Sequence, residues 1–253
     1  MPSGNAQLDE LRRVWAVLGR EDPLWAVLSR SDKRGGRWGV EEFMATGQLE
    51  IDAQMAWLAD QQLPARRQLA VDFGCGAGRL SRALSGHFES VLGIDVSSSM
   101  IDKARSLNAD RANLRFVENH SPRLEGIADG SVDLVYSCMT LQHIPAALAR
   151  GYVEEFLRIL RPGGVAAFQF VAGTDTSIRG RLYDLIPNRW LNPLRRILWR
   201  RSAVFEMHAL NERELLTLLP GYPGSRLVAA LDDGAAGPGW ASRRWYVVRE
   251  QTD

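Results

Sequence analysis

Short apolar runs alternate with helical patterns through the middle of the chain. Apolar residues recur at helical spacing near residues 79–86, 98–108 and 146–160. Between and around these patterns, β-branched and apolar residues gather in short runs, at 68–73, 90–94, 114–117, 132–136 and 164–171. Such an alternation predicts βαβ crossovers and a parallel sheet with helices on both faces.

The flanking regions have different patterns. Residues 1–65 carry no strand pattern, and their apolar side chains recur at helical spacing. A helix near 211–219 and two strand-like runs, at 225–231 and 243–249, follow a region that interrupts the alternation. We therefore expect one domain over residues 1–253, made of a helical cap (1–65), a core (66–172), an insert (173–210) and a C-terminal helix with strands (211–253).

Composition and charge narrow the class of protein. Hydrophobic residues make up 45% of the 253 and charged residues 24%, which is typical of a globular domain. The formal net charge of +1 argues against a surface built to bind nucleic acid. Two cysteines cannot form a disulfide framework, and no segment approaches the ~20 apolar residues of a membrane span. We expect a cytoplasmic protein without stable membrane insertion.

Arginine supplies most of the positive charge, and part of it gathers in the insert. A predicted amphipathic helix there carries four arginines away from its apolar face, Arg195, Arg196, Arg200 and Arg201. Three roles fit such a helix: contact with a membrane surface, recognition of an anionic acceptor, or a solvated lid or homodimer face. We expect the solvated lid or dimer face, because charged side chains usually face water.

The strongest chemical motif is a glycine loop after the first strand-like run. In LAVDFGCGAGRL the strand ends near Asp72, glycines follow at Gly74, Gly76 and Gly78, and a helix then begins. Glycines permit a sharp turn and let a ligand approach the backbone, and amides at a helix start favour an anionic group. A nicotinamide-binding loop would have the spacing G-x-G-x-x-G. This loop reads G-x-G-x-G after an acid, which repels a pyrophosphate but suits an ammonium group.

A second strand-like run also ends in an acid, Asp95, 19 residues after Gly76. An acid about 20 residues beyond a glycine loop is placed to accept hydrogen bonds from both hydroxyls of a ribose. Ser97 then caps the next helix. Alone, Asp95 would be equally typical of a helix cap; together with the glycine loop it predicts a ribose ligand.

With both motifs in place, the chain resembles the class I S-adenosylmethionine-dependent methyltransferases. DFGCGAGRL is similar to the glycine loop of that family, GIDVSSSM to its ribose-binding segment and ILRPGGVAAFQF to its turn into the fifth strand. The likeness covers roughly residues 66–172. It implies a Rossmann-like α/β fold with a seven-stranded, mostly parallel sheet whose last strand is antiparallel. It also implies S-adenosylmethionine as the cofactor.

By this resemblance, the glycine loop cradles the methionine end of the cofactor, Asp72 helps to orient that end and Asp95 binds the ribose. Family members often hold the adenine amine with an acid after the third strand, where this chain has Asn119 and His120. We expect Asn119 to accept from the amine and His120 to stack near the purine. Other residues expected around the cofactor are Phe43, Cys75, Arg79, Val96, Met100 and Ser137.

The segment SCMTLQHIP, after the fourth strand-like run, supplies a candidate base. DNA and protein amide methylators of the family carry Asn/Asp-Pro-Pro-Tyr/Phe there, and this chain lacks that motif. His143 stands where similar O-methyltransferases carry a histidine. Neutral imidazole can take the proton of a hydroxyl near pH 7, so we expect His143 to be a general base. The alternative is that His143 packs the loop or caps the helix at Pro145.

The resemblance places the methyl acceptor between the N-terminal helices and the insert. An aromatic and small-residue patch, Trp38, Phe43, Thr46 and Gly47, is either a lid over the cofactor or packing between helices. Residues expected to reach a sugar-like acceptor are Tyr183, Glu206, His208, Asp232, Asp233 and Trp240. Some sugar O-methyltransferases use Mg²⁺ beside the acceptor hydroxyls, so a Mg²⁺ ion stays open, although no metal-ligand spacing stands out.

The sequence therefore predicts an S-adenosylmethionine-dependent O-methyltransferase acting on a hydroxyl of a small molecule. Segments such as DPLWAVL and LQHIP further resemble an actinobacterial group associated with polysaccharide biosynthesis, including mycobacterial mannoside O-methyltransferases. This favours a sugar or short mannoside as acceptor. A phenol, quinone or polyketide hydroxyl is the nearest rival acceptor, and it calls for a more apolar pocket than the acids and amides that suit a sugar. Rival functions of a different class are a nicotinamide oxidoreductase and a non-catalytic cofactor-binding partner.

Overall fold

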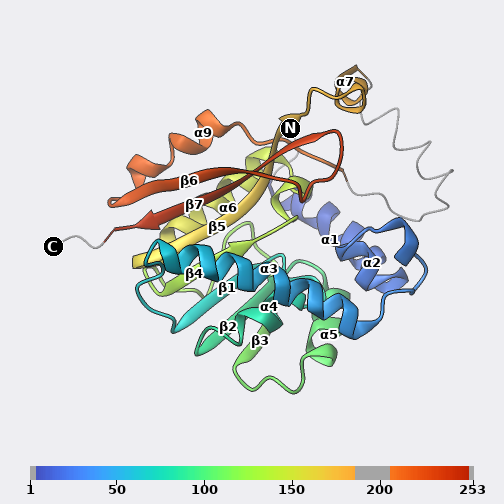
Figure 1. Ribbon diagram of the computed structural model, residues 1–253, viewed down its shortest axis with the longest axis horizontal. Coiled ribbons are helices and arrows are strands. Elements are labelled where there is room, and N and C mark those ends of the chain that lie inside the picture. Colours follow the sequence, from blue (N-terminus) through green and yellow to red (C-terminus); the bar gives the residue numbers. More distant parts are fainter. Residues whose placement is uncertain (1–3, 186–205, 251–253) are drawn as a thin grey trace.

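A seven-stranded sheet forms the centre of the molecule, in the order β3-β2-β1-β4-β5-β7-β6. The computed structural model describes residues 4–185 and 206–250. The strands are β1 (Leu69–Phe73), β2 (Ser90–Asp95), β3 (Leu114–Glu118), β4 (Val132–Ser137), β5 (Leu160–Thr174), β6 (Ser225–Asp233) and β7 (Trp240–Arg249). β1 to β5 run parallel, and β7 lies antiparallel to both β5 and β6. The predicted Rossmann-like fold with an antiparallel last strand is confirmed (Figure 1).

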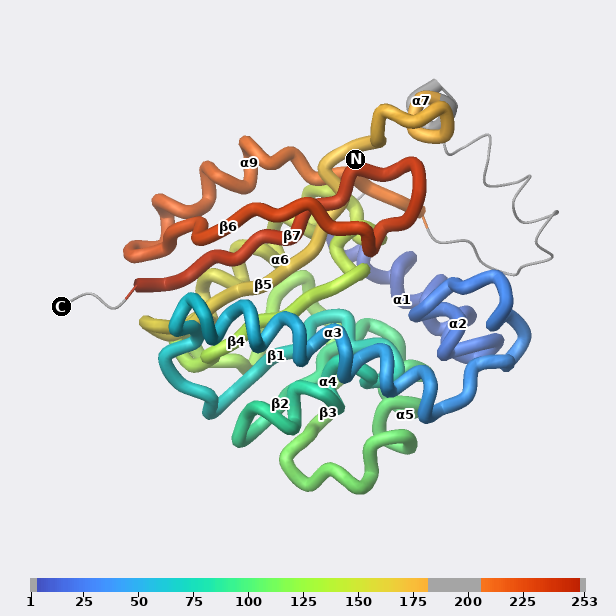
Figure 2. Tube along the Cα trace, in the orientation of Figure 1, coloured from blue at the N-terminus to red at the C-terminus, as the bar shows by residue number. Residues whose placement is uncertain are grey.

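Helices pack on both faces of this sheet. One hydrophobic cluster joins the strands to α3 (Val40–Asp60), α4 (Arg79–Leu84) and α5 (Ser98–Leu107). The other joins them to α6 (Ala146–Ile159) and α9 (Glu212–Leu216). Figure 2 follows the chain through these layers. The remaining helical elements are α1 (Gly4–Glu21), α2 (Pro23–Val27), α7 (Ile178–Leu185) and the short 3₁₀ turns η1 (Ser31–Lys33), η2 (Leu141–His143) and η3 (Leu219–Gly221).

Alternation along the strands divides the buried side chains between the two faces. On β1, Val71 belongs to the cluster with α6, whereas its neighbour Ala70 belongs to the cluster with α3 and α4. On β4, Val135 and Leu134 divide in the same way. Successive side chains of a strand point to opposite faces, so a strand covered on both sides needs apolar residues throughout. This explains the continuous apolar runs in the sequence.

One predicted turn lies inside a strand. The helix α6 ends at Ile159, as RPGG predicts, but β5 already begins at Leu160 and includes residues 161–164. Val132 pairs with Leu160 and Leu134 pairs with Val165, so the register shifts between the two pairs. The glycine turn is therefore accommodated as an irregularity within β5 rather than as a separate loop.

The N-terminal helices pack closely on the core. Ser99 Oγ of α5 donates to the backbone carbonyl of Ala16 in α1 at 3.1 Å. A Cβ on Gly47 of α3 would lie 2.4 Å from the carbonyl oxygen of Arg79, so α3 and α4 touch there. Phe43 is fully buried and packs edge-on against Trp38, with ring centroids 5.8 Å apart. The predicted aromatic patch is thus buried as packing between helices, and its role as a lid over the cofactor stays a prediction.

The arginine-rich helix predicted around Arg195 to Arg201 falls within residues 186–205, outside the described residues. Its role therefore stays a prediction, as do the homodimer and the division of the chain into a cap, core and insert. No helix in residues 4–185 and 206–250 is long and apolar enough to span a membrane.

Candidate active site

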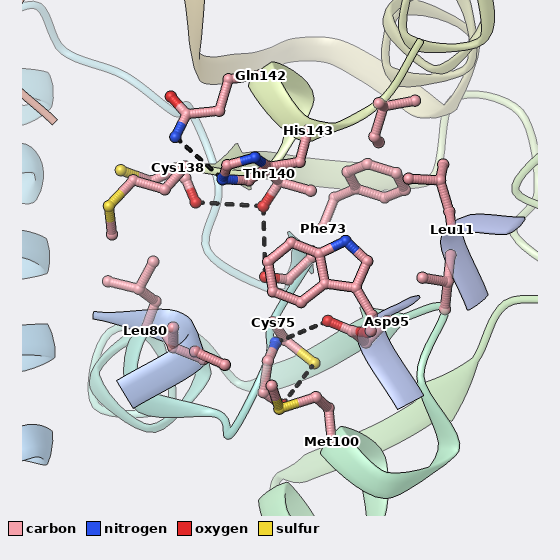
Figure 3. Close-up of a pocket in the computed structure, with 18 of the residues that line it drawn as sticks. Leu11, Phe73, Cys75, Leu80, Asp95, Met100, Cys138, Thr140, Gln142 and His143 are labelled. Atoms are coloured by element: carbon pink, nitrogen blue, oxygen red, sulfur yellow. Dashed lines mark hydrogen bonds between the residues drawn. The ribbon is translucent and has the colours of Figure 1, made fainter. Parts of the chain in front are cut away.

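A cavity of about 380 Å³ lies where the carboxyl ends of β1, β2 and β4 meet α1 and α2 (Figure 3). In open α/β sheets, ligands bind beyond these strand ends. Predicted site residues that line the cavity are Gly74, Cys75, Gly76, Arg79, Asp95, Val96, Met100, Asn119 and His143. One cavity therefore brings together the predicted cofactor loop and the predicted base.

Two glycines of the loop are required by the packing of the protein itself. Gly74 has φ +76° and Gly76 has φ +51°, a left-handed conformation that other residues rarely adopt. A Cβ on Gly74 would lie 2.1 Å from Oγ1 of Thr140, and one on Gly76 would lie 2.6 Å from Cγ2 of Val27. Val27 of α2 and Thr140 after β4 thus pack directly against the loop, and both also line the cavity.

Asp72 lies behind the loop and does not line the cavity. Its side chain is fully buried, and Oδ2 accepts a hydrogen bond from Ser81 Oγ at 2.5 Å. Oδ1 has no hydrogen-bond partner among the described residues. Burial raises the pKa of Asp72 to about 6, although the Ser81 hydroxyl acts in the opposite direction. Asp72 is therefore buried behind the cavity wall, and its predicted role in orienting the cofactor stays a prediction.

Asp95 ends β2 at the cavity wall. Oδ2 accepts from the backbone N–H of Gly76 and Oδ1 from that of Ser97, both at 2.9 Å. A carboxylate offers about four lone-pair sites, so these two hydrogen bonds do not exhaust those that a ligand hydroxyl could use. Burial raises the pKa of Asp95 to about 6, while the backbone N–H groups of Ser97, Gly76 and Val96 lower it. This geometry favours the predicted ribose role.

Asn119 also lines the cavity, but its amide is largely engaged. Nδ2 donates to the carbonyl of Ser121 at 2.8 Å and to the hydroxyl of Tyr152 at 3.1 Å, and Oδ1 accepts from the N–H of Ser121. The amide oxygen retains a second lone pair for a ligand amine. His120 is different: its side chain is 59% exposed, lies 3.7 Å from Glu118 and does not reach the cavity.

Arg79 joins a buried network of charges beside the cavity. Both of its terminal nitrogens donate to Oε2 of Glu50 at 3.1 Å. Oε1 of Glu50 accepts from the hydroxyl of Tyr136 at 2.8 Å and from Arg244 at 3.1 Å. Burial would raise the pKa of Glu50, but the attraction of the two arginines outweighs it and lowers the pKa to about 2. The network ties α3, α4, β4 and β7 together at one wall of the site.

His143 sits in η2, with its ring held at both nitrogens. Nδ1 lies 2.9 Å from the backbone carbonyl of Glu206, which accepts its hydrogen. Nε2 lies 3.2 Å from Nε2 of Gln142. The ring centroid is 5.4 Å from that of Trp15 in α1. Burial lowers the pKa of His143 to about 4, against the smaller raising effect of the Glu206 carbonyl, so the imidazole is neutral near pH 7.

Several predicted cofactor residues do not reach the cavity. Ser137 is buried and donates to the carbonyl of Phe73 at 3.0 Å, so it connects two neighbouring strands. Phe43 packs with Ala77 in a separate hydrophobic cluster. Phe43, Asp72, Gly78, His120 and Ser137 lie outside the cavity wall, and their contacts with a cofactor stay predictions.

The acids expected to hold a sugar point elsewhere. The side chain of Asp232 is 91% exposed and pairs with Arg243 at 2.7 Å. Asp233 pairs with Arg244 in the network described above. Trp240 begins β7 and is not part of the cavity wall. These three positions share the end of the β6–β7 hairpin but do not meet at the predicted base.

The segment after residue 205 does reach the site, through its backbone. The N–H of His208 donates to the carbonyl of Gln142 at 2.7 Å, and Met207 lines the cavity. The His208 ring lies 3.8 Å from the carboxylate of Glu206, and neither side chain lines the cavity. Tyr183 belongs to α7, and its side chain lies outside the described part of the chain.

The sequence analysis did not predict many of the residues that line the cavity, most of which are apolar. The additional residues are Leu8, Leu11, Trp15, residues 26–30, Phe73, Leu80, Ile94, residues 138–140, Gln142, Ile144, Tyr152, Met207 and residues 235–237. The segment DPLWAVL carries one signal, since Pro23 starts a helix and apolar residues follow it. Nothing in that pattern tells which strand ends the helix covers.

The cavity fits S-adenosylmethionine in size and chemistry. Its volume lies in the range of small-molecule sites. It offers backbone at the glycine loop and, at Asp95, a carboxylate with lone pairs for a diol. An amide oxygen at Asn119 and the thioether of Met100 line the same space.

Two features of the site concern metals and thiols. In the part of the chain that the structure describes, no group of three or more His, Cys, Asp or Glu side chains is placed to hold a metal ion. Cys75 and Cys138 both line the cavity as free cysteines, and burial raises the pKa of each thiol.

Known proteins with similar sequences are methyltransferases. Residues 70–164 match the family model described as methyltransferase domain. The chain is 29% identical over 166 residues to malonyl-(acyl-carrier protein) O-methyltransferase of Serratia marcescens, covering 61% of this chain and 62% of that protein. It is 32% identical over 137 residues to ubiquinone biosynthesis O-methyltransferase of Psychrobacter arcticus, covering 52% and 50%. The chain thus spans between half and about three fifths of these curated relatives.

Solved structures with a similar fold also include a methyltransferase. Magnesium protoporphyrin IX methyltransferase from Synechocystis, with SAH bound, aligns with a TM-score of 0.62 at 20% identity over 96% of this chain and 100% of that one. At this identity the likeness shows the fold alone. The fold is that of methyltransferases and residues 70–164 match a methyltransferase domain, which agrees with the predicted class, an S-adenosylmethionine-dependent methyltransferase.

Proposed function

We propose that the protein transfers a methyl group to a hydroxyl oxygen of a small molecule, with His143 as the base. The observation that carries the proposal is one cavity lined by the glycine loop, by Asp95 and by a neutral His143. The relatives named above are O-methyltransferases, which favours oxygen as the methylated atom.

The residues of the cavity divide into two groups. Asp95 would bind the ribose, Asn119 would accept from the adenine amine, and the glycine loop would hold the methionine end. When bound, S-adenosylmethionine supplies an electrophilic methyl group on a sulfonium. To take the hydroxyl proton of the acceptor, Nε2 of His143 would exchange the hydrogen bond from Gln142 for one from the acceptor hydroxyl, while the Glu206 carbonyl keeps the other ring proton on Nδ1.

The low pKa of His143 shapes its role as a base. A pKa of about 4 keeps the imidazole neutral, and its lone pair present, throughout the physiological range. Such a base is weak toward an aliphatic hydroxyl, whose proton is held tightly. A more acidic phenolic hydroxyl gives up its proton more readily, and that chemistry matches the base better.

The wall around His143 favours an acceptor with an apolar body. Leu8, Leu11, Trp15, Met139 and Met207 line the cavity, and among the described lining residues Asp95 is the one acid. Polar groups with open hydrogen-bond sites would be needed to hold the many hydroxyls of a sugar. We therefore place a phenol, quinone or polyketide hydroxyl ahead of the sugar or mannoside, which stays as the second candidate.

Transfer of a labelled methyl group from S-adenosylmethionine tests this function. The acceptor panel contains phenols, catechols and hydroquinones in one arm and mono- and oligosaccharides in the other, each with Mg²⁺ and with a chelator. We expect incorporation in the phenolic arm by the wild-type chain. Incorporation in the sugar arm alone would reverse the order of the two acceptors, and incorporation by neither would contradict the proposed reaction.

The two rival functions, a nicotinamide oxidoreductase and a non-catalytic cofactor-binding partner, predict different ligands or different activities for the same cavity. All-parallel order 3-2-1-4-5-6 is typical of nicotinamide enzymes, and the antiparallel β7 departs from it. Calorimetry with NADH and with S-adenosylmethionine separates the two cofactors. A non-catalytic partner would bind S-adenosylmethionine yet transfer no label, so the isolated chain is the protein to assay.

A further inference from the structure

A row of buried polar side chains runs from the neighbouring strands β5 and β7 to His143. Nε2 of Gln169 in β5 lies 2.6 Å from Oγ of Ser242 in β7 and 3.0 Å from Oε1 of Gln142. Nε2 of Gln142 in turn lies 3.2 Å from Nε2 of His143. All four residues are buried, Gln169 completely. Hydrogen bonds in such a row are costly to leave unmade, so its geometry is strongly constrained.

Backbone groups at the two ends fix the direction of every hydrogen bond in the row. At one end, the N–H of Met139 lies 2.8 Å from Gln169, and because an N–H only donates, the Gln169 atom there is the amide oxygen. The amide nitrogen of Gln169 therefore faces Gln142 and donates to its oxygen. This leaves the nitrogen of Gln142 facing His143.

The other end gives the same direction independently. The Glu206 carbonyl only accepts, so Nδ1 of His143 carries the ring hydrogen. Nε2 of a neutral His143 is then a hydrogen-bond acceptor, which is what the N–H of Gln142 requires. Two backbone groups far apart in the sequence, those of Met139 and Glu206, thus specify one tautomer of the ring.

Gln169 also holds the backbone that carries His143. Met139 has φ +56°, a left-handed conformation that is unfavourable for a side chain with Cβ. Its N–H donates to Gln169, and the Gln142 side chain three residues later accepts from the same amide. The buried side-chain amide of Gln169 therefore forms hydrogen bonds at both ends of the segment from Met139 to Gln142, which leads from β4 to His143.

We propose that Gln169 and Gln142 are positioning residues, which hold His143 as the tautomer with hydrogen on Nδ1 and keep Nε2 as the proton acceptor. This rests on the proposed role of His143 as the base. Neither glutamine needs to touch the methyl acceptor. Gln169 acts through Gln142, and Gln142 acts through the hydrogen bond that it donates to Nε2.

Substitution of Gln169 by glutamate reverses the donor and acceptor roles of the hydrogen bond between Gln142 and His143, without changing the size of the side chain at position 169. A carboxylate accepts from Met139 and cannot donate to Gln142, so the Gln142 amide turns and presents its oxygen to His143. Nε2 then faces an acceptor and gains a hydrogen, while the Glu206 carbonyl still requires the hydrogen on Nδ1, so the ring becomes an imidazolium. Gln54→Glu is the matched control, because Gln54 accepts from the Tyr246 hydroxyl and does not line the cavity.

The experiment reads the ring nitrogens of His143 by ¹⁵N NMR at pH 8, in the full chain without acceptor, with assignment from the His143→Asn variant. We expect hydrogen on Nδ1 alone in the wild type and in Gln54→Glu, and hydrogen on both ring nitrogens in Gln169→Glu. Gln169→Leu, which releases Gln142 without reversing it, should give a mixture. Hydrogen on Nε2 in the wild type, or unchanged signals in both folded Gln169 variants, would overturn the proposal.

Activity gives a second readout that a purely structural role would not show. We expect Gln169→Glu to lower kcat by about tenfold or more, with the KM for S-adenosylmethionine nearly unchanged, because an imidazolium cannot take the acceptor proton. A KM for S-adenosylmethionine that rises by the same factor would indicate a structural role and contradict positioning. The NMR result does not depend on turnover. If the expected tautomer is present and no acceptor is methylated, the proposed function fails while the positioning of the ring stands.

Discussion

The backbone carbonyl of Glu206 accepts a hydrogen bond from Nδ1 of His143 at 2.9 Å, across 63 positions of the sequence. The contact links η2, which follows β4, to the segment just before α9, where the N–H of Leu210 donates to the carbonyl of Val171 in β5. The orientation of the proposed base is therefore set by a backbone group, whose chemistry does not depend on the side chain at position 206.

The ionisation of His143 provides the first prediction. Its pKa of about 4 lies below 6.5, so between these pH values the unfolded chain binds a proton that the folded chain does not. The contribution of His143 to stability is therefore intact above pH 6.5 and falls as the pH drops toward 4, by about 3 kcal/mol in all. Urea unfolding at pH 7 and 4.5 checks this. We expect wild type to lose more stability than His143→Asn; equal losses would mean that the pKa of the ring is not lowered.

The carboxylate of Asp95 provides the second prediction. Because its pKa is raised to about 6, lowering the pH below 6 protonates a group that the ribose hydroxyls need ionised. Affinity for S-adenosylmethionine should fall by about tenfold at pH 5 relative to pH 7.5. Asp95→Asn should lose about tenfold or more at pH 7.5 and show a flatter pH dependence.

Calorimetry measures both affinities, and Asp102→Asn is the control. Asp102 lies on α5 close to the site, with a side chain that is 76% exposed. We expect this variant to match the wild type at each pH. An Asp95→Asn variant with wild-type affinity would remove Asp95 from the ribose site.

The third prediction concerns Glu50, which contacts Arg79, Arg244 and Tyr136. Its lowered pKa means that its stabilising contribution is present above about pH 4.5 and is lost as the pH falls toward 2. Glu50→Ala leaves two buried guanidinium groups without this partner, at a cost of about 3–5 kcal/mol. The melting temperature should fall by about 6–15 °C at pH 7. Glu41→Ala, an exposed position on the same helix, should change it little, and similar melting of the two variants would contradict the network.

The fold could be predicted because its determinants are local. The core strands appear in the sequence as short apolar runs; the run 132–136, for example, is buried on both faces of the sheet. In each crossover helix, apolar residues recur at helical spacing. RPGG illustrates the limit. The glycine turn is real in conformation, with φ +81° at Gly163, but pairing between β4 and β5 decides that it lies inside a strand.

The same distinction between local and tertiary determinants applies to the site. Asp95 and His143 follow strand ends, and topology alone carries strand ends of a parallel sheet to one edge. Asp232 and Trp240 are also chemically suitable for a sugar, but their place depends on how the β6–β7 hairpin turns, which residue types do not specify. Trp15 and Gln142 were missed for a related reason. Their roles come from tertiary contacts with His143, and an apolar helix or a glutamine beside a histidine carries no such mark in the sequence.

The most direct test of the proposed reaction is methyl transfer by His143→Ala, measured at saturating S-adenosylmethionine with an acceptor that the wild type methylates. His120→Ala is the matched control, because His120 lies outside the cavity. We expect His143→Ala to retain the wild-type affinity for S-adenosylmethionine and to lose about 10²-fold or more in turnover, while His120→Ala behaves as wild type. Unchanged turnover in His143→Ala would contradict its role as the base.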